Sequence, residues 1–119
     1  MNTGTVDKVE ASLASFEEQL DPVIDNVFSD GLYGRVMYLN AGDSIVGKRH
    51  KHNHLAILLS GSIAVLSKYG RCIYEAPYIV QVNAGDKRAF LALSDIKYIT
   101  LHATTETDLS KLEAQLTED

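Results

Sequence analysis

The sequence predicts an all-β domain, a small barrel or sandwich of short antiparallel strands with a short helix at each end. Short β-prone runs recur between residues 32 and 103, and turn sequences rich in Gly, Asn and Asp separate them. No long helical pattern lies between these runs, which argues against a parallel sheet built from βαβ units. The length of 119 residues is that of one domain, so we expect a single domain over 1–119.

The first predicted element is a helix over residues 5–20. Apolar residues recur there at spacings of three or four and form one stripe: Val6, Val9, Leu13, Phe16 and Leu20. Asp21-Pro22 ends the pattern, because the residue before a proline is disfavoured in the α-helical region. A helix this short needs a surface to lie on, either the barrel or a second subunit.

The strands of the predicted barrel occupy residues 32–103. Their expected ranges are 32–33, 36–39, 55–59, 63–66, 72–74, 78–82, 89–93 and 98–101. Gly34 falls between the first two ranges, where a glycine indicates a β-bulge. The last predicted element is a helix over 105–117, with Thr107 as its N-cap and Leu109, Leu112 and Leu116 as its apolar stripe.

Composition excludes several classes of partner. The formal net charge is −5, whereas binding to nucleic acid or to an anionic membrane surface requires clustered Lys and Arg. No apolar run is long enough for a membrane-spanning helix, so we expect no membrane partner. The single cysteine, Cys72, cannot form an internal disulfide, which suits a reducing, cytoplasmic environment.

The chemistry of the chain is concentrated at His50, His52 and His54. Alternate residues of a strand share a face, so three imidazoles could converge on a divalent transition metal such as zinc, nickel or iron. Neighbouring side chains on that face lie about 6 to 7 Å apart, however, and three in one straight strand strain the coordination geometry. Either the strand bends near His52, or a further ligand comes from His102 at the end of the last strand.

Nearby cations support a different interpretation. Lys48 and other basic residues beside the histidines add positive charge, which favours an anionic ligand in a pocket without any metal. Tyr33 and Arg35 share one face of their strand, and an inward Arg35 near Arg88 would make such a pocket cationic. The alternative for Arg35 is a surface ion pair, and the alternative for the histidines is an exposed strand end.

The stretch 42–61 and the turn at 83–85 resemble the two sequence motifs of the cupins. This resemblance implies a double-stranded β-helix, a jelly-roll-like barrel. The four positions that carry metal ligands in those motifs fall on Lys48, His50, His54 and Arg88. Two ligand positions therefore carry histidine and two carry cations, which departs from the usual cupin metal centre.

Most of the chain also resembles small cupin-like proteins encoded by bacteriophages and prophages. The resemblance is carried by Phe28-x-x-Gly31-x-Tyr33-x-Arg35, Gly47-x-x-His50-Lys51, His54, Glu75-Ala76-Pro77, Ala84-Gly85-x-Lys87-Arg88 and Ile99-x-x-His102. It implies that His50, His54 and His102 converge and that His52 is peripheral. It also implies a host-cytoplasmic location, and it assigns no reaction.

Two functions remain open at this point. The first is a cupin-like protein whose histidine-lined pocket binds a divalent metal, a small ligand, or both. The second is a metal-free binding or host-interaction module that takes an anionic ligand in a cationic pocket. In either case the apolar stripes of the two flanking helices favour a homodimer or another homo-oligomer.

Overall fold

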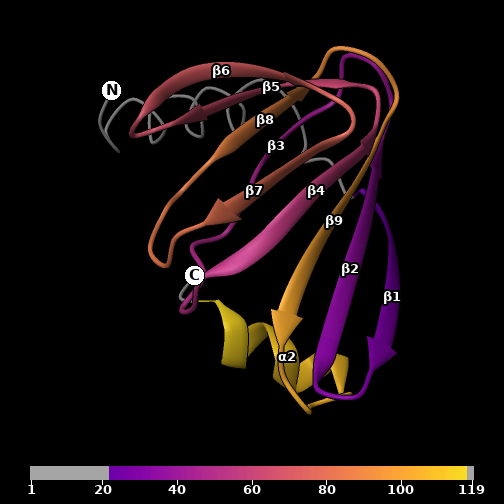
Figure 1. Ribbon diagram of the computed structural model, residues 1–119, viewed down its shortest axis with the longest axis vertical. Helices are drawn as coiled ribbons and strands as arrows, with labels where there is room; N and C mark the ends of the chain where they lie inside the picture. Colours follow the sequence, from indigo (N-terminus) through magenta and orange to yellow (C-terminus); the bar gives the residue numbers. More distant parts are fainter. Residues whose placement is uncertain (1–21, 118–119) are drawn as a thin grey trace.

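The computed structural model describes residues 22–117 and shows two β-sheets with one helix across an end (Figure 1). The predicted helix over 5–20 lies outside the described residues. The strands are β1 (Val23–Ser29), β2 (Leu32–Leu39), β3 (Ser44–Val46), β4 (His54–Ser60), β5 (Ser62–Ser67), β6 (Gly70–Glu75), β7 (Tyr78–Val82), β8 (Ala89–Ala92) and β9 (Ile96–Ala103). The helix is α2 (Leu109–Leu116). It is too short to cross a membrane, and residues 22–117 contain no helix long and apolar enough to do so.

The two sheets are antiparallel throughout and face each other. One has the strand order β1-β2-β9-β4-β7 and the other has the order β3-β8-β5-β6. Strands that are neighbours in space are therefore often distant in sequence, as β2 and β9 are. The prediction of an all-β antiparallel fold is confirmed.

The core lies between the two sheets because their strands alternate apolar inward residues with outward ones. In β4 the inward residues His54, Ala56 and Leu58 are buried, while Leu55 and Leu59 point out. Leu58 from this sheet and Ile63 from the other are the largest fully buried side chains. Burial of a side chain of this size stabilises the fold by roughly 1.5–3 kcal/mol.

Glycine has a specific role at two places in this frame. Gly61, in the turn from β4 to β5, has φ +84°, and an added Cβ would lie 2.2 Å from the carbonyl oxygen of Asp95. Gly34 does not mark the bulge predicted there, since β2 pairs in continuous register with both neighbours. A Cβ at Gly34 would instead lie 3.2 Å from Cδ1 of Ile99, and the irregularity falls between Leu58 and Ser60 of β4.

Several predicted boundaries were wrong. The strands begin at Val23, not at residue 32, so β1 was missed, because its sequence mixes polar and apolar residues and six of its seven residues are exposed. The three-residue β3 is too short to show a pattern. The C-terminal helix covers Leu109–Leu116 in place of 105–117, since Asp108, not Thr107, is the N-cap and accepts a hydrogen bond from the Ser110 amide.

Candidate functional site

One row of side chains on the inner face of the five-stranded sheet carries two of the histidines. Tyr33 of β2 pairs with His102 of β9, and His54 of β4 pairs with Val82 of β7. Because Leu55 pairs with Leu101, His54 lies next to His102 across the β4–β9 ladder. Both imidazoles are buried, with 7% and 4% of their surfaces exposed.

His50 joins them from outside the strand. The ring centroids of His50 and His54 are 4.3 Å apart, those of His54 and His102 are 4.6 Å apart, and those of His50 and His102 are 5.1 Å apart. One ligand nitrogen from each ring lies within 4.8 Å of the other two. The structure thus brings together histidines that are up to 52 positions apart in the sequence.

His52 does not join this cluster. Residues 51–53 bend away from the sheet and are exposed, and His50 forms an isolated bridge with Thr117 before β4 begins at His54. The strand is therefore not straight, which removes the geometric strain expected for three histidines in alternation. The backbone carbonyl oxygen of His52 instead lies 3.4 Å from Nδ1 of His54.

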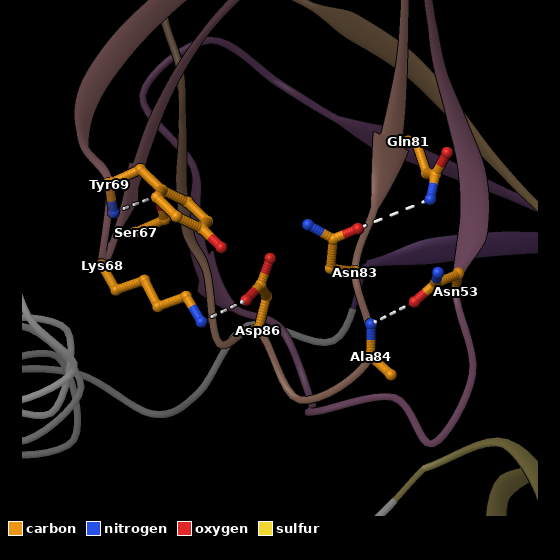
Figure 2. Close-up of polar contacts among 8 residues, drawn as sticks. All are labelled: Asn53, Ser67, Lys68, Tyr69, Gln81, Asn83, Ala84 and Asp86. Carbon is orange, nitrogen blue, oxygen red and sulfur yellow. Dashed lines mark hydrogen bonds and ion pairs between the residues drawn. The ribbon is translucent and has the colours of Figure 1, made fainter.

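The loop between β7 and β8 fixes the bend from one side. The amide of Ala84 donates a 2.8 Å hydrogen bond to Oδ1 of Asn53, and the amide of Gly85 donates one of 2.9 Å to the carbonyl oxygen of His50. Figure 2 shows the Asn53 contact beside the ion pair, 3.2 Å long, between Lys68 and Asp86. The two hydrogen bonds to Asn53 and His50 hold His50 at its place beside the sheet.

The helix α2 fixes the same segment from the other side and lies across the end of the barrel where β9 ends and β2 begins (Figure 1). The amide of Lys51 donates to the carbonyl oxygen of Leu116, and its ammonium donates to that of Ala114. Lys48 forms an ion pair with Glu113. The apolar side of α2 buries Leu112 and Leu116 in a small cluster with Tyr33.

Burial disfavours the charged form of two histidines of the cluster, His54 and His102. Burial lowers the pKa of His102 to about 3, with further lowering from the neighbouring His54, His50 and Arg35. Burial also lowers the pKa of His54, and the charge of Arg88 lowers it further. A neutral imidazole has a nitrogen lone pair, which is the form that coordinates a metal.

A cavity of about 460 Å³ opens beside the cluster. Every residue predicted for the site except His52 lines it: Tyr33, Arg35, Lys48, His50, His54, Arg88 and His102. Its remaining wall is largely apolar, with Ile24, Met37, Ile45, Val82 and Phe90. The cavity therefore has a polar, histidine-bearing part and an apolar part.

Two polar residues of the site were missed in the sequence. The hydroxyl of Thr100 lies 2.9 Å from Nε2 of His102, and the hydroxyl of Tyr98 accepts a 3.2 Å hydrogen bond from Nη1 of Arg88. Both line the cavity. The signal for them was present, since Tyr98 and Thr100 precede His102 by four and two residues and therefore share its face of the strand.

No protein-family model matches the chain, and no curated protein sequence matches it. The fold is similar to a cupin superfamily protein from Desulfitobacterium hafniense, with a TM-score of 0.60, 16% identity and coverage of 76% of this chain and 86% of that one. A Cupin 2 conserved barrel domain protein from Salinispora arenicola also gives a TM-score of 0.60, with 14% identity and coverage of 78% and 86%.

A third similar structure is the hydroxypropylphosphonic acid epoxidase from S. wedmorenis, with a TM-score of 0.58 and 17% identity. The match covers 68% of this chain and 50% of the epoxidase. At such identities the similarity concerns the fold alone. On the strand order, the two-sheet arrangement and these similarities, the chain has the cupin fold.

Proposed function

We propose that this protein binds a divalent transition metal through His50, His54 and His102. The supporting observation is that ligand nitrogens from three separate segments lie within 4.8 Å of one another at the edge of a cavity. Imidazole-only sites suit zinc, nickel or iron. Three protein ligands leave a coordination position open for a small molecule.

The donor set fits such a metal. Zinc–nitrogen distances are about 2.0–2.1 Å, so nitrogens on one ion lie no more than roughly 4 Å apart, and a small inward rotation of the rings achieves this. Thr100 is placed to orient the ring of His102, as outer partners of metal-bound histidines do. A bound metal would supply Lewis acidity to a ligand in the cavity, and no particular reaction is assigned.

Metal analysis of untagged protein tests the proposal. We expect about one metal per chain after reconstitution with zinc, nickel or iron(II), and loss of that metal in His54→Gln and His102→Gln. His52→Gln is the matched control, because His52 lies in the same segment but outside the cluster, and it is expected to retain the metal. Failure of all three ions to bind the wild-type protein would contradict the proposal.

We also propose that the protein forms a homodimer through the outer face of its five-stranded sheet. That face carries apolar side chains on successive strands, and Leu55 is 47% and Ile79 65% exposed. Ile79 pairs with Ile57 and Ile57 pairs with Ile99, which forms an apolar row across three strands beside Leu55. A second copy of the same face would cover this row, since two-fold contacts are the commonest in oligomers.

Light scattering after gel filtration tests the homodimer. A mass of two chains is expected for the wild-type protein and a mass of one chain for Leu55→Glu or Ile79→Glu. Ile73→Glu is the control, because the exposed fraction of Ile73, 59%, lies between those of Leu55 and Ile79 but the residue belongs to β6 of the other sheet. The phage or prophage origin and the cytoplasmic location stay predictions from the sequence.

A further inference from the structure

We propose that the cavity binds a small dicarboxylate between Arg35 and Arg88. Arg35 belongs to β2 of the five-stranded sheet, and Arg88 directly precedes β8 of the four-stranded sheet. Both side chains line the cavity that the histidines border. This inference goes beyond metal binding, because the two guanidiniums line the cavity independently of any ion.

The charges of the described residues leave the cavity positive. Its two acidic lining residues are each paired with a lysine: Asp86 with Lys68 at 3.2 Å, and Glu113 with Lys48. Between residues 22 and 117, no carboxylate forms an ion pair with Arg35 or Arg88. Arg35 is exposed and Arg88 is half-buried at the cavity, so both guanidiniums are accessible and can pair with an anion that enters it.

Arg88 is held in position for this role. Its Nη1 donates to the hydroxyl of Tyr98 at 3.2 Å, and its guanidinium lies over the ring of Phe90, 5.0 Å from the centroid. One edge of the planar group is thus fixed by the protein. Guanidinium N–H groups that remain match the two oxygens of a carboxylate in a bidentate pair.

Arg35 lies in the row of the sheet next to His102. It pairs across the ladder with Thr100, two residues before His102 on the same inward face. Arg88 reaches the same cavity from the start of β8 in the other sheet. The two guanidiniums therefore flank the histidine cluster from the two sheets, which favours a ligand with an acid group at each end.

The apolar wall of the cavity favours an aliphatic chain between the two acid groups of the ligand. Met37, Val82 and Phe90 line the space, and a short aliphatic chain would cover them without leaving a polar group unpaired. The volume of about 460 Å³ is that of a small-molecule site. Succinate and glutarate combine two carboxylates with such a chain and are the probes we choose.

Calorimetric titration of full-length protein that has been stripped of metal and dialysed free of chelator, at constant ionic strength, tests the site. We expect succinate or glutarate to bind, and neutral succinamide not to bind. Arg35→Gln and Arg88→Gln are each expected to raise the Kd about 10- to 100-fold, since a hydrogen bond to a charged group contributes roughly 1.5–3 kcal/mol. Arg71→Gln, in β6 and outside the cavity, is the matched control and is expected to keep the wild-type Kd.

The variants Arg35→Lys and Arg88→Lys test whether a loss of binding comes from the lost guanidinium and not from misfolding. They keep the charge but lose the planar fork, and are expected to bind with Kd values between those of the wild type and the glutamine variants. Absence of binding by both dicarboxylates overturns the inference, as does an unchanged Kd in both glutamine variants. Binding of inorganic phosphate without either dicarboxylate also overturns it.

The metal proposal is tested separately in the same system. His102→Gln is expected to lose the metal and still bind the dicarboxylate in metal-free, chelator-free buffer, because both guanidiniums remain. Arg88→Gln is expected to lose the dicarboxylate and still take up zinc. Loss of dicarboxylate binding in His102→Gln, with native far-UV circular dichroism, would show that Arg35 and Arg88 do not form the site.

Discussion

The two ends of the barrel are built on the same strands but are filled differently. Along β4 the inward residues change from His54 to Leu58, and along β9 they change from His102 to Ile96. The end that contains Leu58 and Ile96 is closely packed, whereas the end beneath α2 holds the histidines and the cavity. The packed end therefore contributes to stability, whereas the other end carries the candidate site. Substitutions at the two ends should differ in their effect on the free energy of unfolding.

The largest expected effect is at the packed end. Leu58→Ala removes a side chain that is only 2% exposed, and it should lower the free energy of unfolding by about 2–5 kcal/mol. His102→Gln, at the other end, should cost much less in metal-free protein, because it replaces a polar ring beside an existing cavity. Urea denaturation of both variants measures the difference, and equal losses would contradict this contrast between the two ends.

The attachment of α2 should give the next largest effect. Leu112→Ala removes a buried side chain from the cluster with Tyr33, and a loss of about 2 kcal/mol or more is expected. Leu109→Ala is the matched control on the same helix, since Leu109 is 51% exposed and should change the free energy by less than about 1 kcal/mol. If the two losses are the same, α2 is not held in place through its apolar side.

Acid should weaken the histidine end selectively. The folded-state pKa values of His102, about 3, and of His54 lie below the ordinary value of 6.5. Below pH 6.5 the unfolded chain therefore binds protons that the folded chain does not, and stability is lost as the pH falls towards 3. The slope should be at most about 1.4 kcal/mol per pH unit for each histidine.

Urea denaturation in EDTA between pH 7 and pH 5 measures this slope. That range lies above the titration of most carboxylates, so the histidines dominate it. His102→Gln should show a shallower dependence than the wild type, whereas His52→Gln, an exposed control, should not change it. A wild-type slope that persists in His102→Gln would mean that other groups cause the loss.

The fold was predictable from the sequence to a larger extent than the site. Regular strands such as β7 have a local signal, whereas β1 pairs along an exposed edge of the sheet and has few inward residues to mark it. For the site, spacing identified His50 and His54 as members of one segment. The convergence of His102 depends on the pairing of β4 with β9, which no local pattern encodes.

The ion-pair partner of Lys48 is a feature of the site that the sequence did not predict. Its proximity to the histidines suggested that it contacts an anion, but in the structure its ammonium pairs with Glu113 of α2. That partner is 65 positions away in the sequence, and only the placement of α2 across the end of the barrel brings the two together. Charge counted along the chain therefore overestimates the charge that a ligand in the cavity would meet.

The smallest expected effect concerns this same pair. Both side chains are about half exposed, and exposed ion pairs contribute only about 0.2–1 kcal/mol. A double-mutant cycle of Lys48→Met and Glu113→Gln should therefore give a coupling free energy in that range, and it should shrink at high salt because exposed charges are screened. Since Leu112 and the hydrogen bonds of Lys51 also hold α2, the single variants should keep the helix in place. A coupling free energy well above 1 kcal/mol would instead make the ion pair a principal attachment of α2 over the cavity.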